Sequence, residues 1–428
     1  METIKYPSPS IWAEILKRPV FEIKNLESVV GEILNDVKQN GDRAVKKYSE
    51  KFDQVQIENL LVSREEIEEA TKLVPESLKK AIKLAKSNVE RFHKYQQCNC
   101  RPLETTPGVK CWQKATPIEK VGLYIPGGTA PLFSTVLMLA VPAAIAGCKE
   151  IVLCSPPRTG GKVNPAILYT ASISGVTKIY KVGGVQAIAA MAYGTETIPG
   201  VYKIFGPGNQ YVTCAKQMVS RQGVVIDMPA GPSEVAVIAD KTSNPDYVAA
   251  DLLAQAEHGI DSQVMLVTTD ENIINPVLNA LNKQLEELPR KDIAKEALNN
   301  SKAIILKDEN ELMALMNNYA PEHLIIATDN PERFGDKVIN AGSVFLGHLT
   351  PESAGDYASG TNHTLPTNGN ARVYSGLNLD SFVKKVTFQQ ISEYGLFNIG
   401  PAIEEMAELE ALHGHKNAVT LRLKKILK

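Results

Sequence analysis

Apolar positions recur at helical spacing in the first part of the chain. The positions on one face of a predicted helix over residues 26–52 are Val29, Val30, Ile33, Leu34 and Val37. Steps of three and four residues are typical of an amphipathic helix. Ser63 and Glu66 form a capping-box pattern, so a second helical segment is expected from there to about residue 95, interrupted near Pro75.

From residue 120 the pattern changes to short β-branched runs that alternate with helical segments. Strands are predicted at residues 121–125, 151–155, 178–182, 203–205, 224–226, 235–239, 263–269, 303–306, 323–327 and 343–345. Helices are predicted between them, among them residues 134–146, 164–174, 185–193, 209–219 and 245–258. Strands that alternate with helices of roughly 10–15 residues predict parallel sheets. The strands are too many for one mononucleotide-binding unit, so we predict an α/β fold with two Rossmann-like parallel-sheet units.

The two ends of the chain depart from this alternation. Residues 1–20 are rich in proline and are predicted to form a short arm that packs on the rest of the chain. After Gly376, amphipathic helices are predicted over residues 379–390 and 401–412, in a tail without a sheet of its own. Such a tail buries its apolar stripe either on its own body or on a second chain, and the pattern leaves both arrangements open.

The composition mainly argues against certain classes of protein. The chain has 428 residues, 44% hydrophobic and 22% charged, with a formal net charge of −2. This balance predicts a globular protein of two or more domains with no nucleic-acid or membrane partner. No apolar run approaches the ~18 residues of a membrane span, and the first residues lack a signal-peptide core. The six cysteines show no C-x-x-C spacing, so a reducing, cytoplasmic location is expected.

Glycine-rich turns follow several of the predicted strands. They are residues 124–131, 183–186, 206–209 and 227–234. Turns between a strand and a helix present backbone N–H groups to phosphate. The G-x-G-x-x-G fingerprint is absent, and the second strand of this series ends in Cys154-Ser-Pro-Pro157, without the acid that holds a ribose. The turns therefore fit either a phosphate-bearing cofactor or tight structural connections.

Polar side chains suited to metal binding and proton transfer gather in the second half. Six of the seven histidines lie between positions 258 and 415. Gln255 and His258 share one helix face, although a histidine before Gly259 also fits a helix C-cap. Glu322 and His323 open a strand, where alternation would point them to opposite faces.

A polar loop and the tail add further candidates. Asp356 and His363 lie in a loop of small residues that is not needed to fill a core, and Glu410 and His415 lie in the tail. Zinc accepts histidine and aspartate, so His258, Asp356 and His415 form a candidate ligand set, with His323 or His363 as competitors. The residues alone thus predict a metal-assisted or acid–base enzyme on an α/β scaffold.

Two other classes of function fit parts of the sequence. Cys148 or Cys154 could serve as the nucleophile of a thiol-dependent aldehyde dehydrogenase, although Cys154 falls in an apolar strand and packing is the simpler interpretation. The glycine turns would also suit a nucleotide-binding regulatory module without chemistry.

Eight ordered motifs between about residues 20 and 424 resemble the histidinol dehydrogenase family. They are residues 121–128, 206–209, 227–234, 255–259, 319–324, 350–356, 362–366 and 415–422. The resemblance implies oxidation of L-histidinol to L-histidine through an aldehyde, with two NAD consumed and one zinc ion per subunit. It also implies a homodimer with shared active sites, in which each tail reaches into the partner's site.

The resemblance implies roles for residues that match the motifs. Glu322 and His323 would be catalytic. The zinc ligands would be Gln255, His258, Asp356 and His415. The ligands and His323 would also touch histidinol, which Ser233, His363 and Glu410 would help to hold. Tyr124, Gln186 and Asn209 would contact NAD.

Pattern and resemblance together divide the chain into four parts. Residues 1–20 are the arm, and residues 21–123 with 233–377 are an α/β domain that carries the metal and catalytic residues. Residues 124–232 are the NAD-binding α/β domain, and residues 378–428 are the tail domain. The loop at residues 158–162 looks longer than is usual in the family, and no change of function is attached to it.

Overall fold

The computed structural model describes residues 1–19, 25–97, 101–127, 131–158, 160–229 and 231–427. These residues form two compact units. The first contains Met1–Tyr95 and Ile118–Phe382, and the second contains Gln96–Pro117 and Val383–Lys428. Cys98, Cys100, residues 128–130 of the first glycine turn and Ala230 of the fourth lie outside the described residues.

A five-stranded parallel sheet occupies the middle of the chain, in the order β6-β5-β4-β7-β8. Its strands are β4 (Lys120–Tyr124), β5 (Glu150–Ser155), β6 (Lys178–Lys181), β7 (Lys203–Phe205) and β8 (Val225–Ile226). Its helices are α5 (Phe133–Ala146), α6 (Pro165–Ile173), α7 (Gly184–Tyr193) and α8 (Gln210–Ser220). The chain runs outward from β4 in one direction and then in the other, so the strand order reverses beside β4. Ligands of open α/β sheets bind where this reversal occurs.

A second parallel sheet has six strands, in the order β1-β11-β10-β9-β12-β13. Its strands are β1 (Glu2–Lys5), β9 (Glu234–Ala239), β10 (Gln263–Thr268), β11 (Lys302–Ile305), β12 (His323–Ala327) and β13 (Ser343–Leu346). Every residue of β9, β10 and β12 is buried, as expected when helices cover both faces of a parallel sheet. The predicted α/β class with two parallel-sheet units is confirmed.

Helices connect and cover the six-stranded sheet. They are α9 (Pro245–Ala256), α10 (Ile274–Glu287), α11 (Lys291–Asn299), α12 (Glu309–Tyr319), α13 (Pro331–Gly335) and α14 (Glu352–Tyr357). The N-terminal arm, which includes α1 (Trp12–Ile15), packs here because β1 pairs with β11 and Trp12 and Leu16 join the core with β12 residues. The expectation that the arm packs on the chain is therefore confirmed, and the arm supplies an edge strand that its prolines had hidden.

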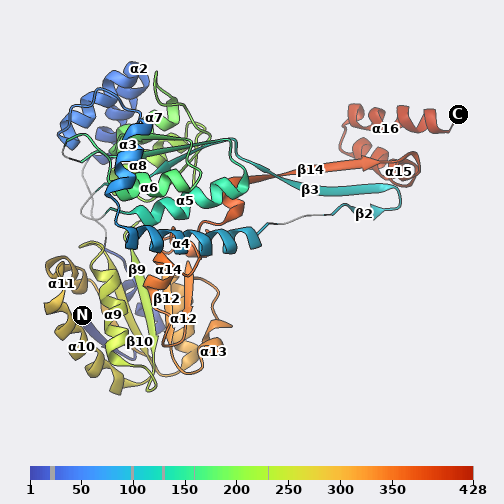
Figure 1. Cartoon of the computed structure of the whole chain (residues 1–428). Coiled ribbons are helices and arrows are strands. Elements are labelled where there is room, and N and C mark those ends of the chain that lie inside the picture. The colour runs from blue at the N-terminus through green and yellow to red at the C-terminus, as the bar shows by residue number, and fades with distance from the viewer. Residues whose placement is uncertain (20–24, 98–100, 128–130, 159, 230, 428) are drawn as a thin grey trace. The chain divides into compact units, whose positions relative to one another are not determined.

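The helices of residues 26–95 are α2 (Leu26–Asp53), α3 (Arg64–Leu73) and α4 (Glu76–Tyr95). The predicted capping box of Ser63 and Glu66 is present, and the backbone of α2 leaves helical geometry at Gly41. Figure 1 shows α2 and α3 beside the helices of the five-stranded sheet, and their apolar faces share its core. The sequence grouped these residues with the six-stranded sheet, because the apolar face of a helix does not reveal which sheet it covers.

The second unit is built on an antiparallel sheet. It contains β2 (Leu103–Thr106), β3 (Val109–Pro117) and β14 (Val383–Ile391), followed by α15 (Glu393–Leu409) and α16 (His413–Ile426). The predicted helix over residues 379–390 is wrong, because β14 pairs with β3 along its whole length, and the tail does have a sheet. Its Val, Thr, Phe and Ile content favours a strand, but its partner lies far away in sequence. The helical C-terminal end is confirmed.

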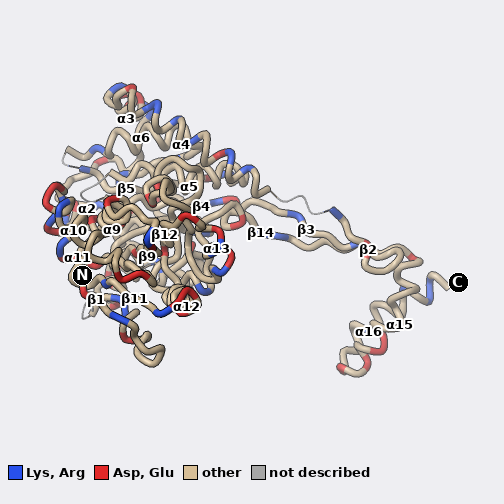
Figure 2. The backbone as a smooth tube through the Cα atoms, turned by 90° about the horizontal axis from the view of Figure 1, so that it is seen from below, with Lys and Arg blue, Asp and Glu red and all other residues tan. Residues whose placement is uncertain are grey.

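Charged residues of both signs are interspersed along the outer helices such as α3 and α4 in Figure 2. Among the described residues, no helix is both long and apolar enough to span a membrane.

Candidate functional site

Polar residues gather at the amino ends of two neighbouring strands of the six-stranded sheet. Glu234 is the first residue of β9, and Glu322 and His323 stand at the start of β12, which pairs with β9. The helix α9 follows β9 and returns toward this edge, so Gln255 near its end and His258 just beyond it arrive at the same place. Both buried strands begin directly at a polar residue, so charged groups are concentrated at one edge of the sheet.

Glu322 and His323 converge rather than diverge. The Nδ1 atom of His323 lies 3.7 Å from Oε2 of Glu322, and both side chains are buried. Glu322 precedes the strand, so the alternation of the strand does not govern its direction, and its carboxylate accepts the N–H of Glu234 at 2.9 Å. His323 Nδ1 lies 3.2 Å from the carbonyl oxygen of Glu234 and can donate to it. One backbone segment thus orients both members of the predicted catalytic pair.

Two more carboxylates approach the same imidazole. Oε1 of Glu352 lies 3.9 Å from His323 Nδ1, and Oδ1 of Asp356 lies 3.7 Å from Nε2. Both come from the short helix α14, where they lie four residues apart and therefore share one helix face. The His323 Nε2 and Glu352 Oε2 atoms are buried and have no hydrogen-bond partner among the described residues.

Burial and the charges of neighbouring groups shift the pKa values of these residues strongly. Burial raises the pKa of Glu322 to about 7 and that of Glu352 to about 8. Burial alone would lower the pKa of His323, but the carboxylates of Glu352, Glu322 and Asp356 outweigh it and raise the pKa. Burial opposes ionisation of Asp356, yet its histidine neighbours hold its pKa below the usual value. Strong shifts of several adjacent groups are typical of functional sites.

The predicted zinc ligands are brought together in part. The ligand atoms of His258 and Asp356 lie within 4.8 Å of each other and of Glu352, which the sequence did not nominate. Gln255 is fully buried; in the amide orientation that satisfies its neighbours it donates to Glu352 and accepts the N–H of Glu234 at 2.7 Å. Nitrogen and carboxylate oxygen are ligands that zinc accepts, so the chemistry of this donor set fits the metal.

The predicted substrate contacts are found in both compact units. Ser233 is half-buried directly before β9. His363 lies close to Asp356, whose carbonyl oxygen is 2.9 Å from its Nδ1 atom, and Nε2 is 3.2 Å from the Thr135 hydroxyl. Glu410 and His415 are exposed residues of the second unit, at the end of α15 and the start of α16.

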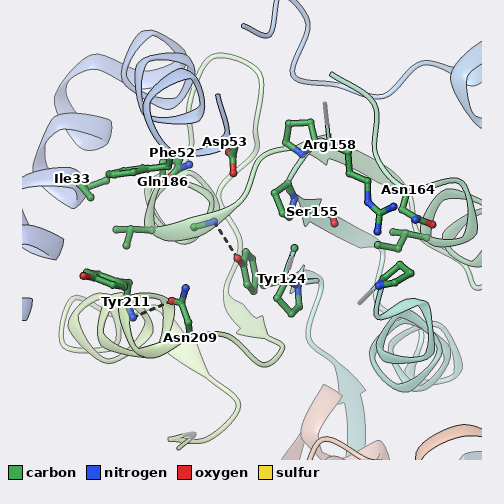
Figure 3. A pocket seen from close by; sticks show the side chains of 18 of the residues that line it. Ile33, Phe52, Asp53, Tyr124, Ser155, Arg158, Asn164, Gln186, Asn209 and Tyr211 are labelled. Atoms are coloured by element: carbon green, nitrogen blue, oxygen red, sulfur yellow. Dashed lines mark hydrogen bonds between the residues drawn. The ribbon is translucent and has the colours of Figure 1, made fainter. Parts of the chain in front are cut away.

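A second candidate site lies at the carboxyl ends of the five-stranded sheet. A cavity of about 870 Å³ is lined there by residues from α2 and from the turns after β4, β5, β6 and β7. Tyr124, Gln186 and Asn209, the predicted NAD contacts, all line it (Figure 3). This is the edge at which the glycine turns were expected to present phosphate-binding groups.

Some polar side chains of this cavity have hydrogen-bond partners in the protein, and others have none among the described residues. The Tyr124 hydroxyl accepts the N–H of Gly184 at 3.1 Å, and Asn209 caps α8 by accepting two backbone N–H groups. Gln186 is buried and neither atom of its carboxamide has a partner among the described residues. The fourth turn has a bracing role, because Asp227 pairs with Lys216 at 2.5 Å and accepts the N–H of Gly206.

Sequence reasoning missed several residues of these sites. Glu234 and Glu352 lie inside recognised motifs, so a search for every acid in those motifs would have found them. Arg18 had no local signal; it pairs with Glu234 at 2.5 Å across 216 sequence positions and stacks on the Tyr319 ring. Asp53 of the cavity was likewise hidden at the end of an ordinary amphipathic helix.

The cysteines considered as nucleophiles are buried and do not line the cavity. Cys154 is fully enclosed within β5, and burial raises the pKa of its thiol far above the ordinary range. Burial also raises the pKa of Cys148 to about 12. Because the thiolate is the nucleophile, these two residues are poor candidates for covalent catalysis.

The chain is similar to known proteins over nearly its whole length. A family model described as histidinol dehydrogenase matches residues 16–423. The histidinol dehydrogenase of Bacteroides thetaiotaomicron is 62% identical over 423 residues, covering 99% of each chain. A crystal structure of histidinol dehydrogenase from Elizabethkingia anophelis superimposes with a TM-score of 0.98 at 56% identity, covering 100% of this chain and 99% of the other.

A more distant likeness concerns the fold alone. An acetylating aldehyde dehydrogenase from Geobacillus thermoglucosidasius is 14% identical with a TM-score of 0.51. The match of the family model over nearly the whole length, together with the close relatives, establishes that the chain belongs to the histidinol dehydrogenase family.

Proposed function

We propose that the protein is an oxidoreductase of histidine biosynthesis that converts L-histidinol to L-histidine through L-histidinal. Two NAD would be reduced, at a site that requires zinc, in a cytoplasmic homodimer. The observation that carries this proposal is the buried group of Glu322, His323 and Glu352 with the half-buried Asp356 beside His258, in a chain of this family.

The zinc ion would be held by Gln255, His258 and Asp356, with His415 as the fourth ligand. When bound, zinc would supply a template and Lewis acid that orients the imidazole and amine nitrogens of histidinol. The buried carboxylates favour this assignment, because a divalent cation would stabilise the ionised form of groups whose pKa values burial raises. Glu352 Oε2, buried and without a partner among the described residues, adds to the negative charge of the donor set.

His323 is proposed to accept the proton of the alcohol. Donation from Nδ1 to the Glu234 carbonyl fixes the ring, so Nε2 is the atom left to face the substrate. The surrounding carboxylates hold a proton on the free imidazole, since they raise its pKa. Engagement of Asp356 by the metal would reduce that negative charge and bring His323 toward the neutral form that a base requires.

Glu322 is proposed to prepare the water that hydrates the aldehyde. A base for this task needs a pKa near the working pH, and burial places that of Glu322 at about 7. Because Glu322 contacts His323, the two groups would act in turn at one place. The imidazole would take the proton in each oxidation, and the carboxylate would act after the first oxidation and before the second.

The cavity at the five-stranded sheet is proposed to hold NAD, which supplies the hydride acceptor. A physical link connects it with the residues proposed to hold histidinol. Pro131 lines the cavity just before α5 begins, and Thr135 in the first turn of α5 contacts His363 at 3.2 Å. This helix would therefore couple the position of the cofactor to that of the substrate.

One measurement tests the activity. The protein is incubated with L-histidinol and excess NAD, with and without a chelator, and NADH is counted per histidinol. We expect two NADH, loss of turnover on chelation and recovery with zinc. One NADH per substrate, or indifference to the metal, would contradict the proposal. NAD binding without any turnover would instead support a regulatory module.

The shared site is tested by mixing inactive chains. His415→Ala and His323→Ala subunits are each expected to be inactive as homodimers, and mixed dimers should regain part of the activity if each tail completes the partner's site. A mixture of two His323→Ala preparations with separable tags is the matched control. Confirmed heterodimers without recovery would argue for a site built from one chain.

A further inference from the structure

The proposed dinucleotide cavity contains a carboxylate to which neither the motifs nor the proposed mechanism assigns a role. Asp53 is the last residue of α2, and Figure 3 shows it at the edge of the cavity beside Phe52. Its Oδ2 atom is buried and has no hydrogen-bond partner among the described residues. No ion pair of Asp53 is found in the described part of the chain, although Arg158 also lines the cavity.

This location is unfavourable for an aspartate unless a ligand uses it. The carboxyl end of a helix carries partial negative charge, which repels a carboxylate. Burial adds a second cost and raises the pKa of Asp53 to about 6. Residues that violate local rules without a compensating contact in the protein concentrate at functional sites.

Neighbouring groups share the same lack of partners. Ser155 and Gln186 line the cavity with side chains that are 1% exposed, and the Ser155 hydroxyl and both ends of the Gln186 carboxamide are unpaired within the described residues. Figure 3 shows both near Asp53 around Tyr124. A ligand that enters here must therefore offer several hydroxyl or amide groups, because buried polar atoms without partners are costly.

We infer that Asp53 accepts hydrogen bonds from the adjacent hydroxyls of a ribose of the dinucleotide and thereby excludes a ribose that carries a 2′-phosphate. In ordinary Rossmann units an acid about 20 residues after the glycine turn makes this contact. Here β5 ends at Ser155 and continues into Pro156 and Pro157, so the usual position has no acid. The structure supplies one from α2, which crosses to the cavity from another part of the chain.

Charge distinguishes the two sides of the cavity. Arg158 is exposed on a loop closed by its N–H bond to the Lys162 carbonyl, and Figure 3 shows it on the side of Ser155 opposite Gln186. A guanidinium there suits the diphosphate that every such dinucleotide carries. A 2′-phosphate beside Asp53 would instead meet a carboxylate with no cation paired to it, so like-charge repulsion selects against the phosphorylated cofactor.

The inference rests on the proposed use of NAD and is tested by replacing Asp53. For Asp53→Asn and Asp53→Ser we expect KM for NAD to rise at least about tenfold, as for loss of a hydrogen bond to a charged group, with kcat changed less than about threefold. The ratio of kcat/KM for NADP to that for NAD should rise at least about tenfold. Glu50→Gln is the matched control, because Glu50 lies on the same helix and contacts the exposed Gln56.

Calorimetric titration of the full-length protein with NAD and NADP separates this inference from the proposed reaction. If the wild-type protein binds NAD in preference to NADP but makes no NADH from histidinol, the proposed reaction is contradicted. The role of Asp53 is then decided by the titrations of the variants alone. Equal binding of both dinucleotides by the wild type, or an unchanged NAD affinity and preference in both folded variants, would overturn the inference. Circular dichroism establishes that each variant is folded, and two substitutions guard against failure of one.

Discussion

The two candidate sites use opposite ends of their parallel sheets. The cavity lies at the carboxyl ends of β4, β5 and β7, where open α/β sheets usually bind ligands. The charged cluster lies at the amino ends of β9 and β12. The cavity is roomy and holds few charges, whereas the cluster packs acids against one imidazole. The same architecture thus places a cavity at one sheet and a cluster of strongly perturbed ionisable groups at the other.

Different physics maintains each site. The cavity is lined by turns and proline-rich connections, and several of its polar atoms have no hydrogen-bond partner among the described residues. The cluster is held by contacts among its own members, such as the Glu322 carboxylate on the N–H of Glu234 and the Arg18 pair with Glu234. A substitution in the cluster should therefore change chemistry or stability, and one in the cavity should change cofactor affinity.

Loss of the imidazole gives the largest expected effect. His323→Ala should lower kcat by roughly 10³-fold, within the range for removal of a general base, while NAD affinity stays within about twofold. Steady-state kinetics and calorimetry measure the two quantities. His348→Asn is the control, because His348 pairs with Asp329 near the surface. A kcat within tenfold of the wild type would remove His323 from the reaction.

Breaking the buried ion pair is expected to cost stability. Arg18→Met leaves Glu234 buried without its cation, which costs about 3–5 kcal/mol in comparable buried pairs. Denaturant unfolding should show this loss, and NAD binding by the folded fraction should be unchanged. Lys5→Met removes a pair between exposed residues, Lys5 and Glu271, and should have little effect. Equal stability of both variants would mean that the arm does not support the cluster.

Acid inactivation should follow the buried carboxyl of Glu322. A base acts only when ionised, so the rate of the second oxidation should fall about tenfold as the pH drops from one unit above to one unit below a pKa of about 7. Glu322→Gln should slow the second NADH by roughly 10²-fold at pH 8 and spare the first. Rapid-quench counting of NADH, with trapping of the aldehyde, measures both steps. Equal slowing of the two oxidations would assign Glu322 another role.

The smallest expected effect is a gain in the stability of the ligand-free protein when Asp53, at the cavity, is replaced. The folded-state pKa of Asp53 is raised to about 6, so its carboxylate destabilises the ligand-free fold above that pH, and the penalty disappears as the pH falls below about 4. Asp53→Asn should stabilise the free protein at pH 7.5 by about 1 kcal/mol, after allowance for partial solvent exposure, with no gain at pH 4. Denaturant unfolding at both pH values checks this, with Glu50→Gln as control. A stabilisation independent of pH would exclude ionisation as its cause.

The local pattern predicted most elements of both sheets, because residues on the buried face of a helix or strand are apolar and recur at a regular spacing. The strand at residues 323–327 and the helices after the glycine turns appear where expected. The failures have one cause. The β14 strand depends on pairing with β3, some 270 residues earlier in the chain, and a local helical period misled the prediction. The arm strand β1 likewise exists because β11 is beside it.

The sequence alone determined the α/β class and the edge with the glycine turns, because strands and helices alternate along the chain. It also identified Glu322, His323, His258 and Asp356 as candidates, because each lies in a short motif. Only the tertiary structure decided that Glu322 and His323 converge, that Glu352 joins them, and that Asp53 faces the cavity. These are relations between segments far apart in sequence. Their distances are set by how helices and sheets pack, which no local period encodes.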